Sequence, residues 1–251
     1  PKRDWSSDVC SSDLGLPLAD FDALVEGFIA LAQRERVALI GGNLTQSPGP
    51  LVVDVTAFGV AHPRRVLTRA GGRAGHTLYV TGSLGASAAG LGRLAAGVDR
   101  ASLDAEAAAC VARYECPDAR TRTGLQVGRN RAASACVDIS DGLADAVRQV
   151  AAASGTGAVI EAAAVPVHAG VQAWAADTGH DPLALALSGG EDYELLFAVG
   201  RRQDRAFRAV AGRTGVPVTA IGRLTAEPAA WLERDGTRQP LGHGFSHFSG
   251  R

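Results

Sequence analysis

Residues 137–143 read Val-Asp-Ile-Ser-Asp-Gly-Leu, a stretch in which an apolar run passes into a turn that carries two carboxylates three positions apart. The residues from Ala135 to Asp138 suit a short buried strand, and apolar residues at helical spacing predict a helix from Leu143 to Ser154. Short strands alternate with helices along the chain, and Asp-Gly at 235–236 is typical of a hairpin. This pattern predicts an α+β fold with helices on one face of a mixed sheet.

The turn at 138–142 has the residue types of a phosphate and metal site. A turn between a strand and a helix can aim both carboxylates, Asp138 and Asp141, at one point, and hard cations such as Mg²⁺ bind carboxylate oxygens. Ser140 offers a hydroxyl, and the N-terminus of the following helix favours a phosphate. The spacing alone favours a purely local explanation, since Ser, Asp and Gly are common in turns and helix caps.

A second acidic stretch lies at residues 188–194, which read Ser-Gly-Gly-Glu-Asp-Tyr-Glu. Paired glycines precede the acids, and an apolar strand is expected from Tyr193 to Val199, so the charges should lie where a strand begins. Ligand sites are often found at such places. Taken alone, the pattern favours a glycine turn with solvated acids.

Two further features could contact phosphate. Gly41, Gly42 and Asn43 follow a short apolar run, and a glycine loop of this kind lets backbone N–H groups approach a phosphate. Arg69 could bind phosphate as a bidentate donor. A plain β-turn and an ordinary surface arginine explain the two features equally well.

The remaining elements follow from the same periods and breakers. Helices are expected at Asp20–Arg36, Ala86–Ala96, Asp104–Tyr114, Arg120–Asn130, Val171–Thr178 and Arg202–Thr214. Strands are expected at Val37–Ile40, Leu51–Val60, Thr77–Thr81, Val159–Val165, Val218–Leu224 and Ala230–Arg234.

The composition excludes several classes of function. The formal net charge of −1 gives no electrostatic footprint for nucleic acid or an anionic membrane. No apolar stretch approaches the roughly 20 residues of a membrane helix. The four cysteines have no metal-site spacing, which favours small buried side chains in a reducing cytosol, and we therefore expect a cytoplasmic protein.

Residues 1–15 stand apart from the rest of the chain. They repeat Ser-Ser-Asp, show neither a helical nor a strand period, and resemble translated sequencing-adapter DNA more than a domain. The chain also contains no methionine. We interpret residues 1–15 as a non-native segment and exclude them from the fold.

Taken in order, these motifs resemble the thiamine-monophosphate kinase family of the aminoimidazole-ribonucleotide-synthetase-like, or PurM-like, superfamily. The resemblance implies a two-domain architecture, with residues 16–63 as the end of an incomplete first domain and residues 64–251 as the second. The matching stretches are Leu39–Asn43, Leu67–Gly71, Leu78–Gly82, Val137–Leu143, Ala186–Leu195 and Gly244–Phe248.

The resemblance also implies a reaction: ATP and thiamine monophosphate give thiamine diphosphate and ADP, with Mg²⁺, in a cytoplasmic homodimer that involves neither nucleic acid nor a membrane. Carried over by position, the nucleotide and metal residues would be Asp138 and Asp141 (Mg²⁺), Asn43 (Mg²⁺ and nucleotide), Ser140 and Gly42 (ATP) and Arg69 (ATP phosphates). Glu191 and Phe245 would contact the thiamine substrate.

This sequence departs from the family pattern at Asn43, where the family has a metal-binding aspartate; a neutral amide is a poorer ligand for Mg²⁺. The first half of the family sequence, which holds further acidic ligands, has no counterpart here. We therefore expect the fragment to be inactive alone. The alternatives are a related superfamily enzyme with another small substrate, or a non-catalytic nucleotide-binding protein.

Overall fold

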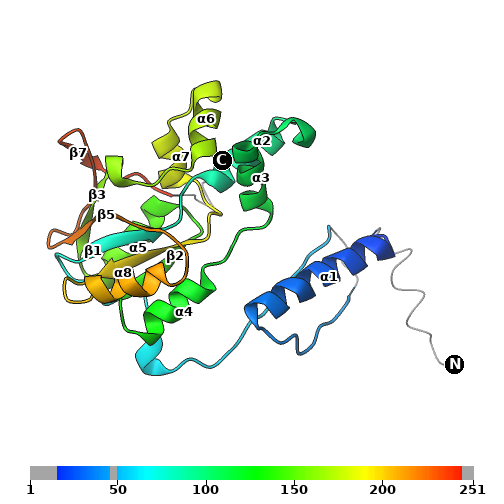
Figure 1. Ribbon diagram of the computed structural model, residues 1–251, viewed down its shortest axis with the longest axis horizontal. Helices are drawn as coiled ribbons and strands as arrows, with labels where there is room; N and C mark the ends of the chain where they lie inside the picture. Colours follow the sequence, from blue (N-terminus) through cyan, green and yellow to red (C-terminus); the bar gives the residue numbers. More distant parts are fainter. Residues whose placement is uncertain (1–15, 46–49, 245–251) are drawn as a thin grey trace. The chain divides into compact units, whose positions relative to one another are not determined.

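The computed structural model describes residues 16–45 and 50–244. The chain divides into two compact units, Pro1–Val60 and Ala61–Arg251, and each is described here by itself. Figure 1 shows the long helix of the first unit and the sheet and helices of the second. Among the described residues, no helix combines the length and apolar character that a membrane span needs.

The first unit contains helix α1, Leu18–Glu35, which starts two residues before the expected Asp20. Arg36 ends the helix in the left-handed conformation, with φ 59°. The strands expected at Val37–Ile40 and Leu51–Val60 are wrong: both segments are irregular and exposed. A β-strand exists only where a neighbouring strand accepts and donates its backbone hydrogen bonds, and no described residue pairs with these segments.

The second unit is built on a seven-stranded sheet in the order β2-β4-β1-β5-β3-β6-β7. Neighbouring strands are antiparallel except β3 and β6, which are parallel. The strands are β1 Thr77–Thr81, β2 Ala135–Ile139, β3 Gly157–Glu161, β4 Glu194–Val199, β5 Val218–Thr225, β6 Ala230–Arg234 and β7 Thr237–Pro240. This architecture confirms the predicted α+β class with a mixed sheet.

Helices surround this sheet, as Figure 1 shows. They are α2 Ala86–Ala95, α3 Ala105–Glu115, α4 Thr121–Arg129, α5 Leu143–Ser154, α6 Ala169–Thr178, α7 Pro182–Ser188 and α8 Asp204–Gly212, with short 3₁₀ turns at Pro63–Arg65, Arg100–Ser102 and Ala162–Ala164. Most predicted helices are confirmed within a few residues. Helix α7 was not predicted, and β3 ends at Glu161 where a longer strand was expected.

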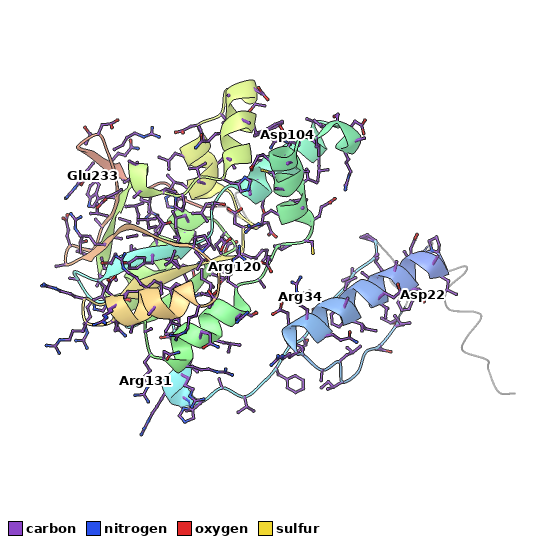
Figure 2. All side chains as sticks on the ribbon, viewed as in Figure 1. Asp22, Arg34, Asp104, Arg120, Arg131 and Glu233 are labelled. Atoms are coloured by element: carbon purple, nitrogen blue, oxygen red, sulfur yellow. The ribbon has the colours of Figure 1, made fainter. Side chains whose placement is uncertain are left out.

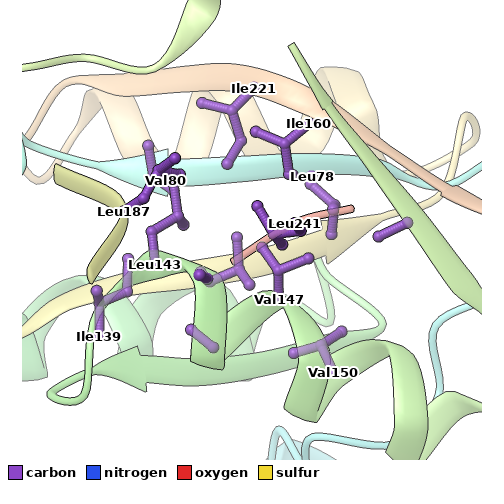
Figure 3. Packing of buried hydrophobic residues seen from close by; sticks show 14 of the residues in the cluster. Leu78, Val80, Ile139, Leu143, Val147, Val150, Ile160, Leu187, Ile221 and Leu241 are labelled. Atoms are coloured by element: carbon purple, nitrogen blue, oxygen red, sulfur yellow. The ribbon is translucent and has the colours of Figure 1, made fainter. Parts of the chain in front are cut away.

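The two faces of the sheet carry separate apolar cores, because successive side chains of a strand point to opposite faces. In β1, Leu78 and Val80 join the core that α5 and α7 cover, which Figure 3 shows. Tyr79, between them, packs toward α4 and α8 in the second core. The expectation of helices on one face is therefore wrong, since helices cover both.

A third, smaller cluster joins α2, α3 and α6 through Ala86, Ala89, Cys110 and Val171. Here α2 and α3 approach closely at Gly90: a Cβ at this position would lie 2.2 Å from the carbonyl oxygen of Cys110. Small residues are required at such a crossing because any side chain would push the helices apart. This helical cluster lies beside one end of the sheet, where the candidate site is found.

The second core makes a direct test of packing possible. Phe207 of α8 is fully buried, and its ring lies 4.9 Å from that of Tyr79 and 5.2 Å from that of Phe197, centroid to centroid. We expect Phe207→Ala to lower the free energy of unfolding by about 3–5 kcal/mol, because it leaves a cavity. Urea unfolding followed by circular dichroism measures this. Leu125→Ala on α4, whose residue is 57% exposed, is the control and should cost less than about 1 kcal/mol; equal losses would contradict the assigned core.

Candidate functional site

The turn between β2 and α5 carries the first predicted set of site residues. Asp138 is exposed, while Ser140 and Asp141 are half-buried. Gly142 has φ 94°, and a Cβ there would lie 2.9 Å from the carbonyl oxygen of Leu187. Glycine is therefore required, by both backbone conformation and space. The N-cap residue of α5 is Gly142, which has no side chain to cap the helix.

The structure brings the two acidic stretches together. The N–H of Glu191 donates to the carbonyl oxygen of Ser140 at 2.7 Å, and the N–H of Tyr193 donates to that of Ile139 at 3.1 Å. These bonds continue the β2–β4 ladder, in which Ile139 pairs with Glu194. Loop 188–193 therefore runs along the turn at 139–142, and Asp138, Asp141 and Glu191 belong to one locality.

Loop 188–193 holds two non-glycine residues in the left-handed region, Glu191 at φ 68° and Tyr193 at φ 50°. Such conformations cost about 1–3 kcal/mol each and persist only where surrounding contacts enforce them. Between the two lies Asp192, which is fully buried. Its carboxylate accepts hydrogen bonds from the backbone N–H groups of Gly85 (2.6 Å) and Ser87 (3.1 Å) at the start of α2.

One residue beyond the loop, the fully buried Glu194 has the largest set of hydrogen bonds near the site. Arg120 donates to both of its carboxylate oxygens, through Nε at 2.7 Å and Nη2 at 2.6 Å. Arg113 of α3 donates at 2.7 Å, and the hydroxyl of Thr81 donates at 2.6 Å. Figure 2 labels Arg120 at the start of α4. Every bond here is charge-assisted, which makes the cluster strong.

Burial and these partners shift the pKa values of the two acids in opposite directions. Burial raises the pKa of Asp192 to about 6, against the effect of the N–H bonds from Gly85 and Ser87. Burial would also raise the pKa of Glu194, but hydrogen bonds from Arg120, Thr81 and Arg113 outweigh it and hold that pKa below its ordinary value. Glu194 is thus kept charged, whereas the environment of Asp192 disfavours its charge.

The acidic character of the locality is seen at Tyr193. Burial raises the pKa of its phenol, and the nearby Glu191 carboxylate raises it further, through its charge and a hydrogen bond. The charges of Asp138 and Asp141 act in the same direction. The charges of Asp138, Asp141 and Glu191 therefore all act on the phenol of Tyr193.

Arg69 lies in an exposed segment next to the edge strand β2. The carbonyl oxygen of the preceding Thr68 accepts a hydrogen bond from the N–H of Cys136 at 2.9 Å, and the carbonyl oxygen of Arg69 accepts one from Ser154 at 3.4 Å. The arginine thus follows the β2 edge, on the strand that carries Asp138 two residues beyond Cys136.

The remaining predicted residues lie elsewhere. Gly42 and Asn43 belong to the first unit, where both are exposed, and Asn43 lines a cavity of about 230 Å³ with residues of α1 and of 50–54. Phe245 lies outside the described residues. The preceding Gly244 packs on the turn, since a Cβ there would lie 2.2 Å from the carbonyl oxygen of Asp141.

The carboxylates of Asp138 and Asp141 suit a Mg²⁺ ion that is also bound by the phosphates of a nucleotide. Mg²⁺ typically takes one or two protein carboxylates and completes its shell with water and phosphate oxygens, and the β2–α5 turn supplies two carboxylates in a neighbourhood of oxygen donors. In the described part of the chain, no three His, Cys, Asp or Glu side chains gather to hold a metal ion by themselves. The residues therefore fit a shared metal–phosphate site and not a closed protein cage.

The three described cysteines are free, and only Cys110 is fully buried. Cys136 is half-buried, and burial raises its pKa to about 12, which disfavours the thiolate form. Cys116 is exposed. The expectation of small buried side chains therefore holds for Cys110 and is wrong for Cys116.

Comparison with known proteins agrees with the motifs. Residues 73–232 match the family model for the C-terminal domain of AIR synthase related proteins. The thiamine-monophosphate kinase of Salmonella typhimurium is 35% identical over 241 residues, which cover 94% of this chain and 72% of that protein. The expectation that half of the family sequence has no counterpart here is therefore wrong. The chain belongs to the thiamine-monophosphate kinase family.

Solved structures of this family share the fold. The thiamine-monophosphate kinase of Stenotrophomonas maltophilia K279a superposes with a TM-score of 0.73 at 29% identity, covering 87% of this chain and 68% of that one. A complex of AaThiL with AMPPCP and TMP superposes with a TM-score of 0.58, also at 29% identity, covering 69% of this chain and 52% of that one. The predicted PurM-like fold is thus confirmed.

No motif in the sequence assigns a role to Asp192, Glu194, Arg113 or Arg120. One signal was available: Glu194 opens an apolar run, Leu195 to Val199, that reads as a buried strand. A carboxylate there requires cationic partners, but the sequence does not say which of the many arginines supply them.

The raised pKa of Asp192 predicts how stability depends on pH. Because the folded-state pKa of about 6 exceeds the ordinary 3.8, the contribution of Asp192 to stability is fully present below pH 3.8 and is lost as pH rises through 6. Relative to Asp192→Asn, the wild-type free energy of unfolding should fall by up to ~3 kcal/mol between about pH 4 and 7. Urea unfolding at several pH values measures this difference. Asp177→Asn, at an exposed position on α6, is the control; a wild-type-to-Asp192→Asn difference that stays constant with pH would contradict the assignment.

Proposed function

We propose that this protein transfers the γ-phosphoryl group of ATP to the phosphate of thiamine monophosphate, with Mg²⁺, and forms thiamine diphosphate and ADP. The observation that carries the proposal is the pairing of the loop at 188–193 with the turn at 139–142, which gathers Asp138, Asp141 and Glu191. The family membership supports it, as does the AaThiL complex, because AMPPCP is an analogue of ATP.

Phosphoryl transfer depends mostly on positioning the phosphates and neutralising their charge. Asp138 and Asp141 would hold Mg²⁺, which neutralises the negative charge of the nucleotide when bound. The hydroxyl of Ser140 would donate a hydrogen bond to the nucleotide. The N–H groups at the start of α5 favour a phosphate at the same turn.

Three further groups complete the assignment. Arg69 would bind ATP phosphates with its planar guanidinium, and Gly42 would offer its backbone N–H. Glu191 would place a carboxylate against the thiamine substrate, whose thiazolium ring is cationic, and Phe245 would pack against the substrate. The acidic locality around Tyr193 suits a positively charged ligand of this kind.

The proposal extends to the metal and the assembly. Asn43 would offer Mg²⁺ only a neutral amide where the family has a carboxylate, and we therefore expect the 251-residue chain to be inactive alone. As the family resemblance implies, the whole protein would act as a cytoplasmic homodimer.

Formation of thiamine diphosphate tests the reaction directly. The chain is incubated with ATP, Mg²⁺ and thiamine monophosphate, and the product is oxidised to its fluorescent thiochrome derivative and quantified by chromatography. We expect this chain alone to form no product. Joined to the N-terminal segment of the family that it lacks, it should form product, and Asp141→Asn should lower that rate about 100-fold or more, since a metal-binding charge is lost. The exposed Asp177→Asn should leave the rate unchanged. A joined chain that binds AMPPCP but never forms product, even at high Mg²⁺, would favour a related enzyme or a nucleotide-binding protein.

The role of Asn43 is tested by restoring a carboxylate. Asn43→Asp adds a charged oxygen ligand, so we expect the Mg²⁺ concentration for half-maximal AMPPCP binding to fall about 10-fold, equivalent to ~1.4 kcal/mol. Calorimetric titrations at several Mg²⁺ concentrations measure this without relying on turnover. The matched control is Asn43→Ser, which removes the amide and adds no charge. Identical Mg²⁺ dependence in wild type and Asn43→Asp would show that position 43 takes no part in binding the metal.

A further inference from the structure

Strand β4 does not require a buried carboxylate at Glu194 in order to pack. An apolar residue at the start of β4 would pack against the sheet without the cost of removing a charge from water. Instead, the chain places Arg113 and Arg120 there, 18% and 12% exposed at their side chains, against a carboxylate that is 0% exposed. Removing Glu194 would leave two partly buried guanidinium groups without this carboxylate, and removing both arginines would leave a buried charge uncompensated, which suggests a role that depends on this geometry.

The two arginines come from elements that otherwise pack in different places. Arg113 lies on α3, which packs in the cluster with α2 and α6. Arg120 directly precedes α4, which packs on the second core of the sheet. Both side chains meet at Glu194, so this carboxylate joins two separate helices to the first residue of β4.

A second buried anchor lies two residues earlier. Asp192 joins the loop to the start of α2 through the N–H groups of Gly85 and Ser87. The hydroxyl of Ser87 also donates to the carbonyl oxygen of Glu191 at 2.6 Å. Asp192 and Glu194 therefore flank Tyr193, and Asp192 directly follows Glu191. Glu191 and Tyr193 are the two residues of this loop with left-handed backbone conformations.

We propose that Arg113 and Arg120, acting through Glu194, are positioning residues that hold Glu191 and Tyr193 in the orientation that binds the thiamine-phosphate substrate. This inference rests on the proposed function, since it concerns the substrate side of the same site. The two arginines do not touch the substrate themselves. They maintain a strained loop in which Glu191 is exposed and Tyr193 is half-buried, and the charges of Asp138 and Asp141 act on the Tyr193 phenol.

The two arginines predict different responses to lysine. Arg120 binds both oxygens of Glu194 with a planar fork, which lysine cannot reproduce, whereas Arg113 gives a single bond to that carboxylate, which lysine can replace. We expect Arg120→Lys to weaken thiamine monophosphate binding about 10- to 100-fold, because small displacements of positioning groups have effects of this size. Arg113→Lys should bind nearly as wild type, and Arg113→Ala should show the loss.

The full 251-residue chain is used, and calorimetry measures the dissociation constants for thiamine monophosphate and, separately, for AMPPCP with Mg²⁺. A positioning role on the substrate side leaves AMPPCP affinity within about 2-fold of wild type, whereas a general structural defect weakens both ligands. Arg100→Lys is the matched control. Arg100 also binds both oxygens of a glutamate, Glu115, but this pair lies at the surface.

Each outcome decides the matter. Selective loss of thiamine monophosphate binding in Arg120→Lys supports the proposal. Wild-type affinity in that variant, or equal loss of both ligands, overturns it while leaving the proposed function intact. Failure of the wild-type chain itself to bind thiamine monophosphate contradicts the proposed function, and the positioning role falls with it. Should Arg120→Lys fail to fold, Thr81→Val replaces it, because it removes one of the four hydrogen bonds to Glu194 without removing a charge.

Discussion

A carboxylate buried at the first residue of the strand β4 imposes the strongest constraint on this structure. Glu194 is inaccessible to water, so its charge must be met by the guanidinium groups of Arg113 and Arg120 and the hydroxyl of Thr81. These hydrogen bonds to Glu194 fix where α3 ends and where α4 begins relative to β1 and β4. The loop at 188–193 leads into β4 at this same point, and its conformation follows from that fixed end together with the hydrogen bonds to the β2–α5 turn.

Local signals in the sequence predicted most of the second unit. The strand at Thr77–Thr81 and the helix at Leu143–Ser154 were predicted with the bounds that the structure has, since period and breakers agree there. The segments 37–40 and 51–60 have strand-like residues but no partner among the described residues, and strand formation depends on pairing that no local pattern encodes. Helix α7 was missed because its seven residues are too few for a helical period to be evident, although Asp181 and Pro182 are typical of a helix start.

The candidate site shows where sequence reasoning ends. Spacing alone favoured an ordinary turn with solvated acids for each acidic stretch. Only the family resemblance predicted that the two stretches contribute to one site. The structure gives the physical connection, which is a pair of backbone hydrogen bonds between residues about fifty positions apart. Arg69 could be placed beside β2 only once Thr68 was seen to bond Cys136. The buried network around Asp192 and Glu194 could not be predicted, because burial is a property of the assembled sheet and not of the residues that carry the charge.

The order of strands has a consequence for how the chain folds. The central strand β1, at residues 77–81, pairs with β4 at 194–199 and with β5 at 218–225. Pairings over more than a hundred residues form slowly, since the intervening chain must first be closed into a loop. At ordinary rates of translation, the ribosome needs on the order of 10 s after making β1 to complete both neighbouring strands. During synthesis, Leu78, Tyr79 and Val80 therefore cannot complete their place in the sheet until β5 has been made.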